Sequence, residues 1–299
     1  MPDEVQSKSD EVQPKLEEVQ PELYAQFSRL LKNKRLSHAY LFAGGFASDQ
    51  MALWLTQAIF CENPHGGLPD QTCRACKLVG AGEFIDLHII EPDGMTIKTE
   101  QIRSLLAVFS QSGYESARKV VLIREAEKMH PTAANSLLKS IEEPESDLTL
   151  ILLTANENLI LDTIRSRTQL VRFPRNDRYL RGLLERQGIL PTEAELVAAL
   201  ADSEEEAQEL AHSTWFVEGA KKARRFVELA QAAPDEGFLY IPNLIEIFSE
   251  KRQQEMAFEL LLQLFNSEKL TTLTQRTFLA QRYWRSNVRF QSALETLLL

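Results

Sequence analysis

No apolar run in this 299-residue sequence approaches the roughly 18 residues that a membrane span needs. The acidic N-terminus also lacks the basic start and apolar centre of a signal peptide. Positive charge is scarce: 33 Lys and Arg against 43 Asp and Glu leave a formal net charge of −10, which excludes a protein that coats nucleic acid by charge alone. We therefore expect a soluble, cytoplasmic protein with no membrane partner.

Cysteine is rare. The chain has three, and an odd number excludes a closed disulfide framework. Two of them lie in the motif Cys73-Arg74-Ala75-Cys76, with Cys61 upstream. This spacing indicates metal binding or redox chemistry rather than a secreted, disulfide-bonded fold.

The first 22 residues are acidic and repetitive. They hold seven acids against two lysines, and Glu-Val-Gln recurs every seven residues in DEVQSKS, DEVQPKL and EEVQPEL. One valine per repeat leaves no second apolar seam for a coiled coil, and Pro14 and Pro21 interrupt a helix. We predict a disordered acidic tail over residues 1–22, with a partner-binding peptide as the alternative.

The next part of the chain alternates short apolar runs with amphipathic helical stretches. Runs of four to six residues that are apolar on both faces indicate buried strands of a parallel sheet. They lie at 39–42, 87–90, 120–123, 149–154 and 169–173. We predict an α/β core, a doubly wound parallel sheet, over residues 23–175. No strand signal follows, so a small helical domain (176–233) and a second all-α block (234–299) are expected.

The segment LFAGGFASDQMA, residues 41–52, begins like a phosphate-binding loop but lacks the residues that hold phosphate. In the pattern G-x-x-x-x-G-K-[ST], Gly44 opens the loop and Asp49, Gln50 and Met51 take the last three places. Asp49 repels a triphosphate, Gln50 removes the cation and Met51 removes the magnesium ligand. Repulsion between two like unit charges about 4 to 5 Å apart, at an effective dielectric constant near 20, costs about 3 to 4 kcal/mol. Taken alone, Gly44-Gly45 also fits a plain turn between strand and helix.

The second acidic site of a nucleotide enzyme is also altered. After the strand KVVLI, Arg124 and Glu125 stand where a magnesium-coordinating Asp would follow. A basic side chain at this place cannot coordinate Mg²⁺. We therefore expect no ATP as a cofactor.

Several stretches resemble one family, the delta-prime subunits of the bacterial DNA polymerase III clamp loader. The most specific is Asn135-Ser136-Leu137-Leu138-Lys139 followed by Glu142-Glu143-Pro144, which the ATP-hydrolysing gamma and tau subunits share. The wider resemblance runs through SHAYLFAGG (37–45), KVVLIREAEKMHPTAANSLLKSIEEPE (119–145), ILLTANENLILDTIRSRTQLVRF (151–173) and NVRFQSALETLLL (287–299). It implies an AAA+ core, a helical lid (176–233) and a helical collar (234–299) that joins five subunits into a ring.

The resemblance also implies a role without hydrolysis. Delta-prime subunits commonly have a degraded nucleotide site, and Thr163-Ile164-Arg165-Ser166-Arg167-Thr168 is similar to the family's Ser-Arg-Cys motif, with Thr168 in the cysteine's place. Its arginine corresponds to Arg167, which would reach the γ-phosphate held by a neighbouring subunit as an arginine finger in trans. In isolation, such an arginine is an ordinary surface group.

The family carries a zinc module with the spacing C-x8-C-x2-C-x2-C. Cys61, Cys73 and Cys76 match the first, third and fourth positions, and Asp70 stands in the second. The resemblance thus implies a structural zinc site at about 61–76, with His65 as a rival fourth ligand. Alternatives are three reduced cysteines without metal and a redox role.

The implied partners are the gamma or tau and delta subunits in a hetero-pentamer, the sliding clamp indirectly, and primer-template DNA. Lys98 and Arg103 are the candidate phosphate contacts, against ordinary solvated charge. Two other functions remain open from the sequence: an active ATPase of the same family with an atypical loop, and a zinc-containing adaptor outside replication.

Overall fold

The computed structural model describes residues 15–109, 115–116, 118–143 and 147–299. It divides into two compact units, Met1–Asn176 and Asp177–Leu299. Among the described residues, no helix is both long and apolar enough to pass through a membrane. The further division of the second unit into a lid and a collar stays a prediction.

The first unit is built on a five-stranded parallel sheet with the order β2-β3-β4-β1-β5. All five strands are parallel, so their carboxyl ends meet at one edge of the sheet. The predicted doubly wound core is confirmed. The strands are β1 (Ala39–Ala43), β2 (Leu87–Ile90), β3 (Arg118–Ile123), β4 (Asp147–Thr154) and β5 (Gln169–Arg172).

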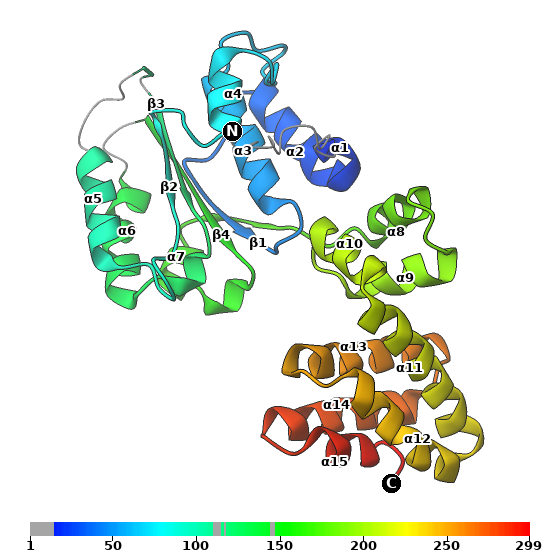
Figure 1. The fold of residues 1–299 in the computed structure, drawn as a ribbon. Coiled ribbons are helices and arrows are strands. Elements are labelled where there is room, and N and C mark those ends of the chain that lie inside the picture. Colours follow the sequence, from blue (N-terminus) through cyan, green and yellow to red (C-terminus); the bar gives the residue numbers. More distant parts are fainter. Residues whose placement is uncertain (1–14, 110–114, 117, 144–146) are drawn as a thin grey trace, which may run out of the picture. The chain divides into compact units, whose positions relative to one another are not determined.

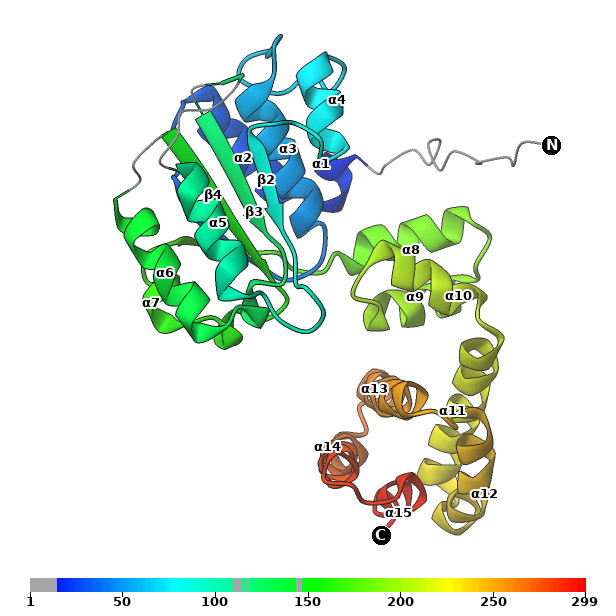
Figure 2. The ribbon, with the colours of Figure 1, turned by 60° about the vertical axis from the view of Figure 1, so that its left-hand side comes forward.

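Alternate residues of each strand enter two separate cores, one on each face of the sheet. On one face, Phe42 and Leu122 pack with α2, α3 and α4; on the other, Leu41 and Val121 pack with α5 and α6. Figures 1 and 2 show these helices on opposite sides of the sheet. Burial of both faces explains why the strands are almost continuously apolar. The helices of this unit are α1 (Leu16–Val19), α2 (Pro21–Lys32), α3 (Ser48–Phe60), α4 (Arg74–Gly80), α5 (Thr99–Phe109), α6 (Pro131–Glu142) and α7 (Asp162–Arg165), with the 3-10 turns η1 (Ala126–Lys128) and η2 (Glu157–Leu159).

The predicted tail ends too late. Residues 16–19 form α1 and residues 21 and 22 begin α2, with Gln20 between the two helices, so this part is ordered. Val19 is 3% exposed and Gln20 is 4% exposed, so the third Glu-Val-Gln repeat is part of the core. Pro21 fits because the first position of a helix needs no amide donor. The first two repeats, in residues 1–14, lie outside the described residues.

The second unit is entirely helical in the structure, as predicted. Its apolar helix faces pack on one another; for example, Phe258 lies against Trp284 and Phe290 with ring centroids 5.7 and 5.5 Å apart. A polar residue caps the start of α10, where the Ser203 hydroxyl accepts the Glu206 amide at 3.0 Å. The helices are α8 (Asp177–Arg186), α9 (Pro191–Leu200), α10 (Glu204–His212), α11 (Thr214–Ala232), α12 (Pro234–Ile247), α13 (Lys251–Ser267), α14 (Thr271–Arg285) and α15 (Phe290–Glu295).

Candidate functional site

The loop between β1 and α3 lies at the carboxyl edge of the sheet, where parallel α/β folds bind ligands. Gly44 has φ +106°, and a Cβ on it would come within 2.5 Å of the Phe173 carbonyl oxygen. Its amide donates to the Thr154 carbonyl at 2.9 Å. Glycine is therefore required here by the close approach of the chain after β5.

The three altered positions of the loop have different environments. Asp49 and Gln50, on the first turn of α3, line a groove of about 850 Å³ that also contacts α2 and residues 65–72. Met51 is fully buried in the core beneath the loop. Its thioether therefore contributes to packing, at the place where a nucleotide enzyme needs a hydroxyl for magnesium.

Arg124, directly after β3, forms ion pairs across the loop. Its Nε and Nη2 donate to the two carboxylate oxygens of Asp49 at 2.6 and 2.9 Å, and its Nη1 donates to Glu91 after β2. The bond to Asp49 raises the pKa of Arg124. The neighbouring Glu125 has a left-handed backbone (φ 49°) and pairs with Lys128 instead. One guanidinium is thus neutralised by two carboxylates where a nucleotide enzyme would hold magnesium and phosphate.

Gln20 fixes the loop from its other side. Its side-chain amide donates to the Phe46 carbonyl of the loop at 2.9 Å and to the Pro174 carbonyl after β5 at 2.8 Å. Asn176 in turn donates to the Val19 carbonyl at 2.9 Å. The third repeat of the N-terminal sequence therefore holds together the loop and the exit of β5.

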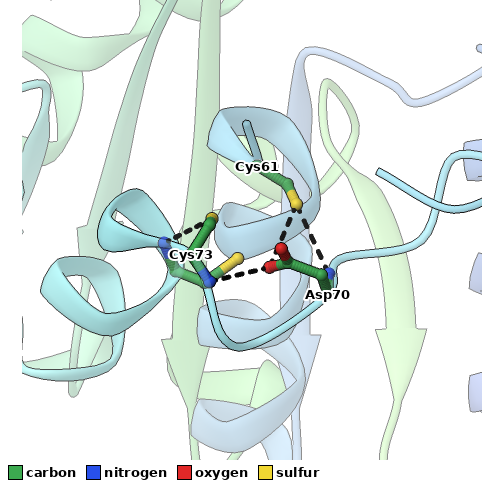
Figure 3. A group of neighbouring side chains, drawn as sticks. Cys61, Asp70 and Cys73 are labelled. Carbon is green, nitrogen blue, oxygen red and sulfur yellow. Dashed lines mark hydrogen bonds between the residues drawn. The ribbon is translucent and has the colours of Figure 1, made fainter. Parts of the chain in front are cut away.

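The three cysteines and Asp70 form one cluster, and their potential ligand atoms all lie within 4.8 Å of one another. Asp70 Oδ1 accepts the Cys61 thiol at 3.4 Å and the Cys73 amide at 3.1 Å (Figure 3). It also accepts the Thr72 amide at 3.1 Å. A tetrahedral zinc site with thiolate ligands needs ligand atoms about 3.8 Å apart. The cluster is close to that size, and backbone amides orient its carboxylate as outer-shell groups orient metal ligands.

The protonation of the cluster depends on its environment. The amide of Cys73 holds the pKa of the Asp70 carboxyl well below its usual range, so Asp70 is ionised at neutral pH. Burial raises the pKa of the Cys76 thiol far above its usual range, and burial also raises the pKa of Cys61. A divalent cation would have to displace these thiol protons, which zinc does readily.

His65 is not part of this cluster in the described residues. It forms a short bridge with Leu68 and lines the same groove as Asp49. Of the two rival fourth ligands, the structure brings Asp70 to the cysteines.

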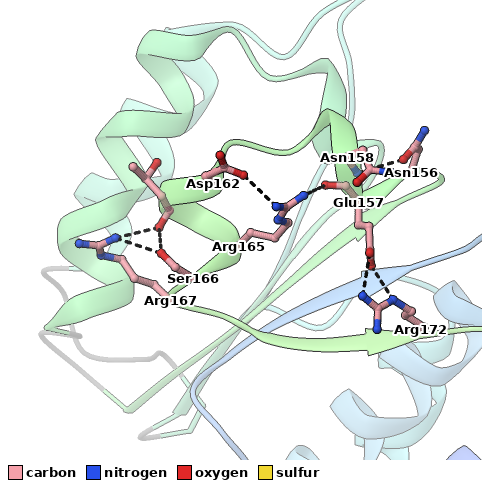
Figure 4. A network of polar contacts seen from close by, with 9 residues as sticks. Asn156, Glu157, Asn158, Asp162, Arg165, Ser166, Arg167 and Arg172 are labelled. Carbon is pink, nitrogen blue, oxygen red and sulfur yellow. Dashed lines mark hydrogen bonds and ion pairs between the residues drawn. The ribbon is translucent and has the colours of Figure 1, made fainter.

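Arg167 lies between α7 and β5, and it is held by three groups. Its Nε donates to Glu142 at the end of α6. Its Nη1 donates to the Thr163 carbonyl at 3.1 Å and to Ser166 Oγ at 3.3 Å (Figure 4). Its side chain is 39% exposed. Thr168, in place of the motif's cysteine, donates to the Ile164 carbonyl at 3.1 Å and so closes α7.

Comparisons with known proteins identify the family. A family model described as "DNA polymerase III, delta subunit" matches residues 19–177. DNA polymerase III subunit delta' of Bacillus subtilis (strain 168) is 37% identical over 239 residues, which are 79% of this chain and 72% of the relative. The chain belongs to the delta-prime family of DNA polymerase III subunits. The α/β core with a parallel sheet is confirmed by the observed strand order, and its AAA+ type stays a prediction from the resemblance.

Further relatives span shorter parts of the chain. The delta' subunit of Pseudomonas aeruginosa is 36% identical over 148 residues, covering 48% of this chain and 45% of the relative. The tau/gamma subunit of Haemophilus influenzae is 34% identical over 139 residues, covering 46% of this chain and 20% of the relative. This chain is thus similar in sequence to a tau/gamma subunit over less than half of its length.

The two DNA-contact candidates of this delta-prime chain lie around the start of α5. Lys98 pairs with Asp93, which raises the pKa of Lys98, and its side chain is 55% exposed. Arg103 is exposed on α5 and forms no ion pair with any described residue. Their contact with DNA stays a prediction. Because Lys98 is paired with Asp93, Arg103 is the more available of the two for a phosphate contact.

Sequence reasoning missed three residues that shape the site. Glu91 and Glu142 are the acidic partners of Arg124 and Arg167, and Gln20 fixes the loop. For Glu142 a signal existed, because it lies in the most specific motif of the resemblance. Glu91 and Gln20 gave no signal, since each acts on residues far away in the sequence.

Proposed function

We propose that this delta-prime chain is a non-hydrolysing member of a clamp loader, which presents Arg167 to the ATP site of a neighbouring subunit. The ion pair of Arg124 with Asp49 is the observation that carries the proposal. It places a carboxylate and its own counter-ion where a nucleotide enzyme holds phosphate and magnesium. A triphosphate would have to break this pair and then meet the freed carboxylate.

Arg167 supports the second half of the proposal. Its side chain is partly exposed, and it pairs with Glu142, the last residue of α6, which contacts α7. A guanidinium is always charged and offers forked donors, so it suits the stabilisation of phosphate charge in trans. The family's gamma or tau and delta subunits would be the other members of a hetero-pentamer. Loading a sliding clamp onto primer-template DNA would be the joint activity.

The test is reconstitution with gamma or tau and delta subunits, the clamp and primer-template DNA. Arg167→Ala should leave assembly intact but lower the ATP turnover of the complex about 10-fold or more, because an arginine finger stabilises charge only in the transition state. Gel filtration checks assembly, and a titration with fluorescent ATP measures the ATP affinity of the isolated wild-type chain. Unchanged turnover would refute the finger, whereas micromolar ATP affinity of the isolated chain would favour an active ATPase.

We propose in addition that Cys61, Asp70, Cys73 and Cys76 hold a structural zinc ion. Three thiolates and one carboxylate would complete a tetrahedral shell, and such a closed set stabilises a loop rather than activating water. Zinc would fasten residues 61–73 to the start of α4, at the wall of the groove that contains Asp49.

Metal analysis tests the zinc site. The purified chain should contain about one equivalent of zinc, and Cys76→Ser should lose it, because a structural site needs all four ligands. His65→Ala is the matched control and should keep the metal. Loss of zinc in the His65 variant, or a metal-free wild type after purification with added zinc, would contradict the assignment.

A further inference from the structure

Among the described residues, one end of the Arg167 guanidinium has no hydrogen-bond partner. Arginine carries five N–H donors. The single Nε–H binds Glu142, and the two Nη1–H groups bind the Thr163 carbonyl and Ser166 Oγ. Among the described residues, Nη2 binds nothing. Its two N–H groups are therefore the ones available to a ligand outside this chain.

Glu142 is placed to hold this orientation. It is the last residue of α6, where the helix dipole adds partial negative charge, and α6 contacts α7. The Glu142 carboxylate accepts from Nε of Arg167 and does not bridge to Nη2. The Thr163 carbonyl and Ser166, both from the segment around α7, fix the guanidinium from a second direction.

Glu142 orients Arg167 rather than withdrawing it from use. A carboxylate that sequestered an arginine would form a forked pair with two of its nitrogens, as Asp49 does with Nε and Nη2 of Arg124. Glu142 instead accepts only from Nε and leaves Nη2 open. Both side chains are partly exposed, at 39% for Arg167 and 49% for Glu142, so the arginine would be a mobile surface group without these contacts.

We propose that Glu142 is a positioning residue, which holds Arg167 with Nη2 outward for the triphosphate bound by the adjoining subunit. This inference rests on the proposed finger role of Arg167. Positioning before the reaction lowers the barrier because the ordering of the long side chain has already taken place. The contribution of Glu142 should therefore appear in the turnover rate and should require Arg167.

The experiment uses the reconstituted complex with DNA and clamp, and it measures kcat and KM for ATP. Glu142→Ala should lower kcat about 5-fold with KM changed less than about 2-fold. Glu142→Gln should stay within about 2-fold of wild type, because its amide oxygen still accepts from Nε. Glu143→Ala is the matched control: it removes the same charge one residue later, and the Glu143 side chain is not among the hydrogen-bond or ion-pair partners of Arg167 within the described residues.

The double variant Glu142→Ala, Arg167→Ala separates the two claims. If Glu142 acts through Arg167, the double variant should be no slower than Arg167→Ala alone. If Arg167→Ala lowers kcat while Glu142→Ala keeps the wild-type kcat, the positioning role of Glu142 is overturned and the finger role of Arg167 stands. A faster Glu142→Ala variant, or equal losses in the Glu142 and Glu143 variants, would also overturn it. Wild-type rates in Arg167→Ala would refute both claims.

Discussion

Arg124, directly after β3, and Arg167, between α7 and β5, have similar exposure but different hydrogen bonding. Arg124 is 31% exposed and Arg167 is 39% exposed. Arg124 uses Nε, Nη1 and Nη2 on two carboxylates, whereas Arg167, among the described residues, uses Nε and Nη1 and meets one carboxylate. Each arginine thus makes three hydrogen bonds, and the distribution of the free donors, rather than their number or the exposure, distinguishes an arginine that closes a site from one that serves another site.

The local charge differs in the same sense. Around Arg124 two carboxylates face one cation, so the loop region carries an excess of negative charge toward a triphosphate. Around Arg167 one carboxylate faces one cation, and the nearby Arg165 has Asp162 as its own partner at 2.9 Å. The charges around Arg124 thus repel a phosphate, whereas those around Arg167 tolerate one.

Rebuilding the phosphate-binding loop after β1 tests the comparison between Arg124 and Arg167. The triple variant Asp49→Gly, Gln50→Lys, Arg124→Asp removes the carboxylate, returns the phosphate-binding lysine and restores an acid after β3. We expect ATP affinity to rise roughly 100-fold, because each charge change is worth several kcal/mol and 1.4 kcal/mol is tenfold. Fluorescent ATP titration of the full chain measures it. Met51 is left in place, since its side chain is fully buried and a smaller residue would open a cavity.

The single variant Arg124→Asp is the control for this rebuilding. It adds a third acid beside Asp49 and Glu91 without the lysine, and it should bind ATP no better than wild type. Equal affinities for the triple variant and the wild type would show that the loop is closed by its backbone rather than by charge. Gln20, which holds Phe46, would then be the next residue to change.

The sequence predicted what is local or periodic. The strand at 87–90 is found with those bounds, and the core runs to β5, because strands buried on both faces are nearly continuous apolar runs. The thiol cluster was also predictable, since its four residues lie within sixteen positions of one another in the sequence, Cys61 to Cys76. The structure confirms the grouping, while the metal itself stays a prediction.

Long-range partners could not be predicted. Arg124 is 33 residues from Glu91, and Arg167 is 25 residues from Glu142. The first pair depends on β2 and β3 being neighbours, and the second depends on α6 ending beside α7. The tail boundary failed for a related reason, because repeat composition indicates disorder while Gln20 finds its acceptors at residue 174.

The smallest expected effect is on local stability, and it compares Arg124 with Arg118 at the two ends of β3. Arg124→Ala should lower the local free energy of unfolding of β3 by about 1 to 2 kcal/mol, since a partly buried, forked pair is lost and two carboxylates are left together. Hydrogen exchange of the β3 amides, followed by mass spectrometry, should accelerate about 5- to 30-fold.

Arg118→Ala is the matched control at the other end of β3. Its pair with Asp147 joins side chains that are 55% and 64% exposed, at 3.1 Å, so its loss should change exchange less than about 2-fold. Added salt should reduce the effect of Arg124→Ala only partly, because partly buried charges are screened less than exposed ones. Equal acceleration in the two variants would mean that the pair across the loop is an ordinary surface contact, and the distinction between the two arginines would then rest on Arg167 alone.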